Sequence, residues 1–293
     1  MANKVWNPSS NDLNVAGNWL ASGVPADEDF LHFNDVASFP MIASVTGAPV
    51  NAKDFSVIVE RGFIQHIGQL GTPFTPANIR TLIFEGIGNN NSNYFSSGTA
   101  ITRAFINTTS QKDDIVVLAG SIAKTMVANG KASIASGATL TSTAGTISPS
   151  GGGQSQLTIN SGVTTSGLTV HCDGGMVTCS STVPNVVVTD GVFILAGSAG
   201  VTGSVQVKGG VFYWDAADSA SPSTIALLEV YGGAFRTRTN RIGRTLTESY
   251  SYGSGLIDLS IGGLNITYTN APRACGENAI KYPRGASTTA AFV

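Results

Sequence analysis

Aspartates at the turns of a repeated phrase are the first candidates for chemistry in this sequence. Asp173 and Asp190 each stand close before a glycine, at matching places in neighbouring copies of the phrase. Two carboxylates on successive strands have the residue types that glycoside hydrolysis needs. Aspartate before glycine is also ordinary turn chemistry, and we favour that interpretation. Asp215 and Asp218 share one loop and have no acidic counterpart in the neighbouring copies.

Two other groups contain metal-ligating residue types. His171, Cys172 and Cys179 offer donors for zinc, but no second cysteine pair or nearby histidine completes four ligands. Asp27-Glu28-Asp29 offers oxygens for calcium, but it lacks the alternating ligands of a known calcium loop. We therefore expect no metal and no cofactor. With Cys275 the cysteines number three, which argues against a disulfide framework. Buried free thiols are favoured over a Cys172–Cys179 bridge across a corner.

Arginines are concentrated near the C-terminus. Four lie within nine residues, and two more follow: Arg236, Arg238, Arg241, Arg244, Arg273 and Arg284. Guanidinium groups pair bidentately with carboxylates and also bind phosphates. A solvated loop explains the same composition without any function. Our hypothesis is that these arginines contact neighbouring subunits or the shell of a particle.

Most of these candidate residues lie in or beside a sequence repeat, so the structure of the repeat determines where they stand. Each copy alternates apolar and variable positions, breaks at glycine and then resumes with apolar or aromatic residues, which predicts strand, sharp corner and strand. The copies span 168–176, 186–193, 205–212 and 228–235. A repeat of about 20 residues with variable length predicts a solenoid whose corners accept insertions. We expect an all-β, right-handed parallel β-helix. The valines expected in one inward column are Val170, Val188, Val207 and Val230.

Composition agrees with an all-β protein. Charged residues make up 12% of the chain and hydrophobic residues 42%, with many valines and isoleucines, which is too apolar for a disordered chain. A net charge of −2 gives no general reason to expect nucleic acid as a partner. The sequence has no run of 18 apolar residues and no basic-then-apolar signal peptide, so we expect neither membrane insertion nor secretion.

The first 35 residues form a distinct pattern that ends in an apolar strand. Its members are Trp6, Asn18-Trp19, Gly23-Val24-Pro25, Asp27 and Asp29. The pattern resembles the opening segment of β-helical surface proteins, including autotransporter-type passengers, and the resemblance covers roughly a tenth of the chain. It implies a β-helix and says little about function. An open solenoid end exposes apolar core and strand edges, so we expect Trp6, Trp19 and Pro25 to form an irregular cap. The alternative is an ordinary loop-rich core segment.

Three regions are expected along the chain. They are an N-terminal cap with irregular β structure (1–95), the solenoid (96–235) and a C-terminal β segment with an extended tail (236–293). Since no segment keeps an apolar period of about 3.6 residues, helices should be few. The stretch from Thr269 to Val293 has no periodicity, and we expect it to gain order only against a neighbour.

Three functions are compatible with these features. The favoured hypothesis is a structural virion protein without enzymatic activity: a phage capsid decoration (cement) or head-fibre protein on the capsid exterior, made in the host cytoplasm. Its partners would be itself, as a homotrimer, and the major capsid protein, because solenoids expose flat sides that can pair around a threefold axis. We expect no nucleic acid and no membrane as partners.

The first alternative is a secreted or cell-surface adhesin that binds host glycan, which the opening segment favours and the missing signal peptide opposes. The second is a tailspike-like polysaccharide depolymerase, which lacks a convincing set of carboxylates. Aromatic residues offer sugar-binding surfaces, but we expect them in the core; they are Phe193, Tyr213, Trp214 and Phe235.

Overall fold

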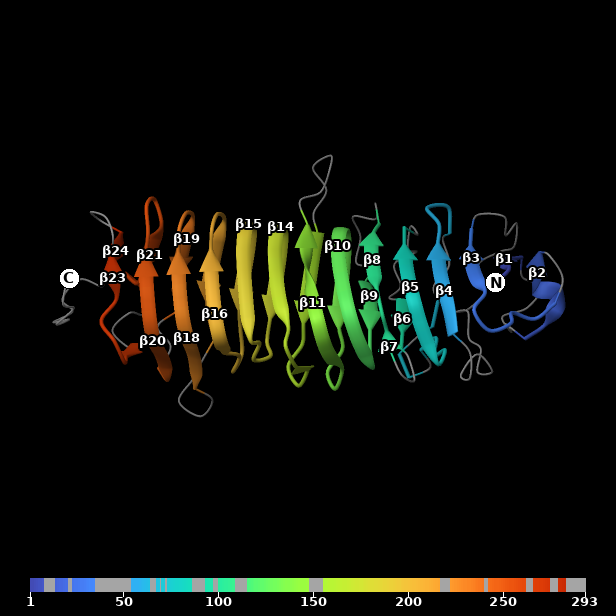
Figure 1. Ribbon diagram of the computed structural model, residues 1–293, viewed down its shortest axis with the longest axis horizontal. Helices are drawn as coiled ribbons and strands as arrows, with labels where there is room; N and C mark the ends of the chain where they lie inside the picture. Colours follow the sequence, from blue (N-terminus) through green and yellow to red (C-terminus); the bar gives the residue numbers. More distant parts are fainter. Residues whose placement is uncertain are drawn as a thin grey trace. The chain divides into compact units, whose positions relative to one another are not determined.

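The chain folds as a β-solenoid of about nine turns, as predicted from the repeated phrase (Figure 1). The computed structural model describes residues 1–7, 14–20, 23–34, 54–63, 67–68, 70–71, 73–85, 93–96, 100–108, 115–147, 155–216, 222–239, 242–261, 266–274 and 279–282. Within these ranges the only helix is η1 (Ala16–Asn18), a single 3-10 turn. No helix in the described part of the chain is long and apolar enough to cross a membrane. The all-β prediction is confirmed, whereas the handedness of the coil stays a prediction.

The contacts divide the chain into an N-terminal unit (Met1–Ser142 with Pro149–Gln156) and a C-terminal unit (Thr143–Ser148 with Leu157–Val293). The division into three regions stays a prediction. The N-terminal unit contains β1 (Asn3–Trp6), β2 (Trp19–Leu20), β3 (Phe30–Phe33), β4 (Asp54–Val59), β5 (Asn78–Phe84), β6 (Asn93–Phe95), β7 (Ala100–Ile101), β8 (Ala104–Asn107), β9 (Ile115–Leu118) and β10 (Ser121–Ile134).

Strands β11 (Thr139–Ile147) and β12 (Ser155–Ile159) contribute residues to both units. The C-terminal unit contains β13 (Thr164–Thr165), β14 (Thr169–Cys179), β15 (Asn185–Leu195), β16 (Val201–Val207), β17 (Val211–Trp214), β18 (Ser223–Val230), β19 (Ala234–Arg236), β20 (Arg244–Ser251), β21 (Leu256–Asp258), β22 (Ile266–Tyr268), β23 (Arg273–Ala274) and β24 (Ile280–Lys281).

Parallel pairing in the C-terminal unit places equivalent positions of successive turns above one another. Strands β15, β16, β18 and β20 follow one ladder, and β15, β17, β19, β21 and β24 follow the other. Neighbouring strands in a sheet lie about 4.8 Å apart, so each ladder stacks like side chains at that spacing. Successive residues point to opposite faces, which gives every ladder an inward and an outward column.

The register of the inward valines differs from the prediction in one place. Val188, Val207 and Val230 share a column, but the residue paired with Val188 on β14 is Cys172. Val170 pairs with Val186, two residues away, and so belongs to the next inward column. Both columns are buried, since Val170 and Cys172 each have no exposed surface.

The β14–β15 ladder is irregular on both sides of Asp173: Thr189 has no register partner, and Gly174 and Gly175 oppose the single Gly191. These two β-bulges cancel, because Cys172 pairs with Val188 and Met176 pairs with Val192 at the same offset. They therefore do not cause the difference in register. A slip of two residues keeps every side chain on its own face, so the apolar pattern cannot detect it.

Glycine is required at the bend within β15 and at the corners after β16 and β18, because the backbones of neighbouring turns approach closely there. Gly191, Gly210 and Gly233 all have positive φ, at 77°, 65° and 69°. A Cβ on Gly233 would collide with the carbonyl oxygen of Gly210, and one on Gly210 with that of Gly191. The phrase therefore breaks at glycine because each corner lies directly against the corner of the preceding turn.

Aromatic residues fill the core of the C-terminal unit. Phe193 and Phe212 stack with ring centroids 5.0 Å apart, and Phe212 and Phe235 follow at 5.3 Å. Trp214 lies 6.0 Å from Phe235, and all four side chains are fully buried. The expectation that Phe193, Trp214 and Phe235 are core residues is confirmed. For Tyr213 it is wrong, because this residue alternates with buried Phe212 and Trp214 and lies half-buried on the outer face of β17.

The opening segment packs around buried aromatic rings in the N-terminal unit. Trp6 and Trp19 pair across the antiparallel β1–β2 ladder with ring centroids 4.9 Å apart, and both lie about 6 Å from Phe33. Pro25 is buried as well. Asp29 accepts hydrogen bonds from the backbone N–H groups of Ala2 (2.6 Å) and Ala26 (2.9 Å). This burial fits the expected cap, and the capping role itself stays a prediction.

Candidate functional site

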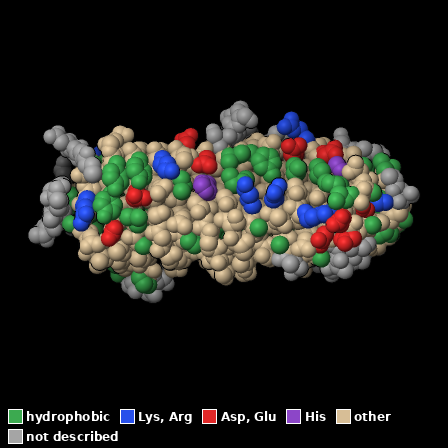
Figure 2. Space-filling view, viewed as in Figure 1, with side chains coloured by type: hydrophobic (Ala, Val, Ile, Leu, Met, Phe, Trp, Pro, Cys, Tyr) green, Lys and Arg blue, Asp and Glu red, His purple; other side chains and the backbone are tan. Residues whose placement is uncertain are grey.

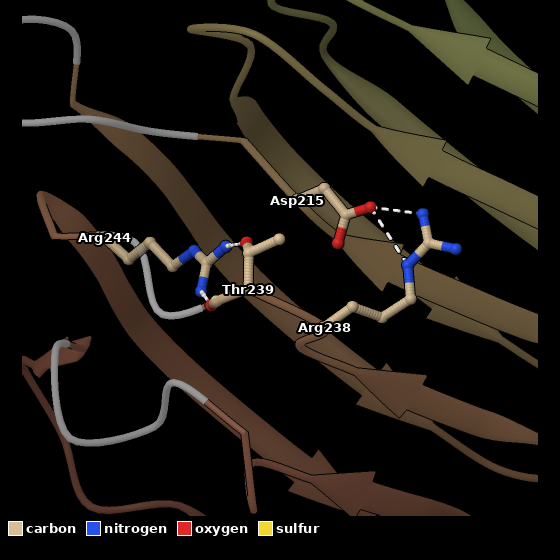
Figure 3. Close-up of polar contacts among 4 residues, drawn as sticks. All are labelled: Asp215, Arg238, Thr239 and Arg244. Atoms are coloured by element: carbon tan, nitrogen blue, oxygen red, sulfur yellow. Dashed lines mark hydrogen bonds and ion pairs between the residues drawn. The ribbon is translucent and has the colours of Figure 1, made fainter.

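Arg238 lies on the surface and is engaged within its own chain (Figure 3). Its Nε donates to Asp215 Oδ2 at 3.0 Å, and Nη2 contacts the same oxygen. Its Cζ lies 4.1 Å from the ring centroid of Tyr213, a cation–π distance. The hydrogen bond to Asp215 raises the pKa of Arg238 above its ordinary value. Arg238 therefore ties two successive turns together, and Tyr213 supports it from the outer face of β17.

Arg244 has no exposed surface, so it cannot form the outward contact expected of it. Its Nε donates to the carbonyl oxygen of Ala216 at 3.0 Å, and its Nη1 and Nη2 donate to the carbonyl and hydroxyl oxygens of Thr239, both at 2.7 Å (Figure 3). The guanidinium also lies 5.6 Å from the ring centroid of Trp214. Arg244 is a structural residue that holds the loop after β19, and its hydrogen bonds offset the cost of burying a charge.

The other arginines do not form one cluster. Arg236 is half-buried on the outward column of β17, β19, β21 and β24, between Tyr213 and Asp258. Arg273 is exposed on the β20–β23 ladder, with its guanidinium 5.7 Å from the Tyr250 ring. Arg241 and Arg284 lie outside the described residues, as does most of the tail.

The candidate carboxylates lie together on the β14–β15 ladder. Asp173 and Asp190 are register partners on β14 and β15. The Thr189 hydroxyl donates to Asp173 Oδ1, and the Gly191 N–H donates to Asp190 Oδ1 at 2.7 Å. The local bond of Asp190 fits the turn interpretation, whereas Asp173 is bonded to the neighbouring turn, and the two carboxylates remain adjacent. Asp218 lies outside the described residues.

The zinc candidates do not share a face of the wall. His171 points outward from β14, whereas Cys172 and Cys179 are free, buried thiols. Burial raises the pKa of both thiols, that of Cys179 to about 12. Within the described ranges no three His, Cys, Asp or Glu side chains gather as metal ligands do. Cys275 lies outside those ranges.

The calcium candidates serve the backbone. Asp27 Oδ1 accepts the N–H of Asp54 at 2.7 Å, and Asp29 binds the two N–H groups described above. Glu28 has a positive φ of 67° and forms an ion pair with Arg80 at 3.4 Å.

Three tyrosines form a group on the outer face that was not predicted from the sequence. Tyr231 and Tyr252 stack with ring centroids 4.9 Å apart and planes 15° apart, and Tyr250 lies 6.0 Å from Tyr252 at 12°. Tyr231 is 41% exposed, and the other two are half-buried. With Glu229 and Glu248 they form what we call the tyrosine surface. Figure 2 shows hydrophobic, acidic and basic side chains intermixed over the C-terminal unit, at the left of the view.

A signal for this group existed in the sequence. Tyr231 stands directly before a corner glycine, and Tyr252 occupies the same position one turn later. Recognising the pair requires the correct register across turns of unequal length.

An apolar outward column marks the N-terminal unit. Register pairs align side chains of β3, β4, β5, β8 and β10: His32, Ile58, Ile83, Phe105 and Met126. We call this the apolar column. Phe105 is 36% exposed, and charged residues stand two positions after or before the column: Glu60, Glu85, Arg103 and Lys124.

A shallow hollow is found in the C-terminal unit, with a volume of about 380 Å³. Its lining is uncharged and rich in hydroxyl groups: Thr182, Ser198, Gly200, Val201, Thr202, Pro222, Thr224 and Ala226. Without a titratable or aromatic group, this lining offers no catalytic chemistry.

The fold and these surfaces can be set against known proteins. Comparisons with protein-family models, with curated proteins and with solved structures give no match.

Proposed function

We propose that this chain is a structural protein of a phage virion, a capsid decoration (cement) or head-fibre protein that binds the outer surface of the capsid as a homotrimer. Its partners are a second and third copy of itself and the major capsid protein, and it has no enzymatic role. The observation that carries the proposal is the apolar column of the N-terminal unit. A ladder of half-buried, mainly apolar side chains with exposed Phe105 has the composition of an interface core, and its charged flanks resemble an interface rim.

Parallel packing of copies suits this face. Consider copies related by a rotation axis that runs parallel to the apolar column. The residue two positions after the column in one copy then faces the residue two positions before the column in its neighbour. Glu85 then faces Thr81, and Arg103 faces Asn107, so no like charges are opposed. Closed cyclic symmetry of this kind is the usual form of homo-oligomers.

The capsid contact is assigned to surface arginines. Arg236, Arg238 and Arg273 remain half-buried or exposed, and Arg241 and Arg284 belong to the same proposed set. Guanidinium forks pair with carboxylates of a neighbouring chain. Arg244 leaves the set because it is buried.

The trimer is tested by light scattering after size-exclusion chromatography. We expect the wild-type chain to be a trimer and Phe105→Glu to be a monomer with unchanged secondary structure. Leu70→Glu is the matched control, because Leu70 is 83% exposed in the same unit and lies outside the apolar column. A monomeric wild type, or a trimer that survives Phe105→Glu, refutes this interface.

The particle role is tested by heating virions with and without the protein. Particles that lack it should open at a lower temperature. Unchanged melting with loss of host binding points to the adhesin, and release of reducing sugar from host polysaccharide by the purified chain points to the depolymerase.

A further inference from the structure

We propose that the tyrosine surface of the C-terminal unit binds a neutral glycan chain. The ligand class is an uncharged polysaccharide or oligosaccharide that lies across the turns formed by β18 and β20. This site goes beyond the structural role proposed above and does not require the trimer.

The rings supply apolar contact area in a fixed arrangement. Tyr231 follows β18 and Tyr252 follows β20, so their stacking at 4.9 Å repeats the spacing of the turns. Tyr250 lies on β20, two residues before Tyr252, and its ring plane is 12° from that of Tyr252. Tyrosine has few rotatable bonds and carries a polar tip, so it loses little conformational entropy when a ligand binds. The facing sides of Tyr231 and Tyr252 contact each other, so the C–H groups of a pyranose ring would pack on the parts of the rings that remain exposed.

Carboxylates stand beside these rings and are already oriented. Glu229 Oε1 accepts the Tyr231 hydroxyl at 3.0 Å, and its Oε2 accepts the Gln206 amide at 3.0 Å. Glu248 Oε2 accepts the Tyr250 hydroxyl at 3.4 Å, and its Oε1 accepts the Asn270 amide at 3.5 Å. Each carboxylate oxygen has a second acceptor position, which suits the vicinal hydroxyl groups of a sugar.

The tyrosine hydroxyl is held in its neutral form. The hydrogen bond to Glu229, followed by burial and nearby charge, raises the pKa of Tyr231 above its ordinary value. A neutral phenol donates one hydrogen bond and accepts another, so it can serve glutamate and ligand at once.

The charges around these rings balance. Glu229 and Glu248 are acidic, whereas Arg273 stands over Tyr250 at 5.7 Å and exposed Lys208 precedes Tyr231 by one turn. Two carboxylates and two cations leave no net charge, so the surface lacks the cationic excess with which proteins bind polyanions such as nucleic acid. An uncharged chain with many hydroxyl groups matches both the acceptors and the rings.

Affinity electrophoresis tests the site with named probes. The full-length protein is run in native gels that contain dextran, mannan, xylan or soluble β-glucan, with polygalacturonate and heparin as anionic probes. We expect at least one neutral polysaccharide to retard the wild type, and Tyr252→Ala to weaken that binding about tenfold or more. Glu229→Gln keeps the shape of the side chain and should weaken binding less.

A matched control separates this surface from a general loss of aromatic residues. Tyr213→Ala removes an outward tyrosine from β17, outside the tyrosine surface, and should leave retardation unchanged. If Tyr252→Ala alters thermal unfolding, the same electrophoresis is done with Tyr231→Ala and Glu229→Gln instead. Retardation by anionic probes only, no retardation by any neutral probe, or equal loss in Tyr213→Ala would each overturn the proposal.

Discussion

Two aromatic ladders of the C-terminal unit lie on different strand ladders and face opposite ways, one into the core and one to solvent. Inside, Phe193, Phe212 and Phe235 stack at 5.0 and 5.3 Å with no exposed surface. Outside, Tyr231 and Tyr252 stack at 4.9 Å, and Tyr231 is 41% exposed. The spacing is the same because parallel pairing sets it on both faces. Register alone therefore builds an aromatic stack, whereas the face on which it lies decides whether the stack is buried in the core or exposed to solvent.

The arginines repeat this contrast. Arg244 is fully buried and bonded to backbone and hydroxyl oxygens, whereas Arg238 pairs with Asp215 at the surface. The two residues have the same side chain and stand six residues apart. Because one is buried and the other is at the surface, they should contribute differently to the stability of the fold, and the same holds for the two aromatic ladders.

The largest expected effect comes from a charge placed on the inner face. Val207→Asp should lower the free energy of unfolding by more than about 4 kcal/mol, because the carboxylate has no partner in the core. Thr202→Asp, on the exposed face of the same strand, should cost less than about 1 kcal/mol. Urea unfolding followed by circular dichroism, at fixed protein concentration, measures both. Equal effects would contradict the assignment of faces.

Truncation within the inner ladder comes next. Phe212→Ala should cost about 3–5 kcal/mol, because it leaves a cavity between Phe193 and Phe235. Tyr252→Ala, in the outer ladder, should cost about 1 kcal/mol or less. Thermal unfolding of the two variants under one buffer condition compares them. A larger cost for the tyrosine would remove the distinction between the ladders.

The cap hypothesis extends the test to the N-terminal unit. Trp19→Ala should cost about 3–5 kcal/mol, since the ring is 4% exposed and packs on Trp6 and Phe33. Chemical unfolding monitored by tryptophan fluorescence and circular dichroism gives the value. Leu20→Ala is the neighbouring control, because Leu20 is 42% exposed and should change stability little. Unchanged unfolding of Trp19→Ala would refute the cap.

The arginine pair should show a smaller difference. Arg244→Ala leaves buried acceptor oxygens of Ala216 and Thr239 without a donor and should cost about 2–4 kcal/mol. Arg238→Ala breaks a surface ion pair and should cost less than about 1 kcal/mol. Calorimetric unfolding at low and high salt distinguishes the two variants. Salt should weaken only the stabilisation that the Arg238 ion pair provides.

The smallest effect concerns ionisation of Tyr231. Its pKa is raised in the folded protein, so the stability it contributes is present below the ordinary tyrosine pKa of about 10 and is lost as pH rises through the folded value. A pH titration followed by ultraviolet absorbance should show one fewer tyrosine with a raised pKa in Tyr231→Phe than in the wild type. Glu229→Gln should return the pKa of Tyr231 toward its ordinary value, because the hydrogen bond to the carboxylate is the main cause of the shift. An unchanged titration in Glu229→Gln would contradict that bond.

Much of the fold was predictable because alternation and glycine spacing are local signals. Val188, Val207 and Val230 share one buried column as expected, and Asp190 accepts the local backbone N–H that the turn interpretation predicts. The candidate sites were less predictable. Nothing in the spacing of Arg238 and Arg244 indicates that one is exposed and the other buried, since their environments come from loops and turns distant in sequence.

The sequence by itself determined the parallel all-β solenoid and the residues that face inward, because both follow from alternation within single strands. Only the tertiary structure decided the register, which places Cys172 rather than Val170 beside Val188. It also decided the burial of Arg244 and the stacking of Tyr231 on Tyr252. The physical reason is the two-residue period of a strand: a slip of two residues keeps every face and changes every neighbour.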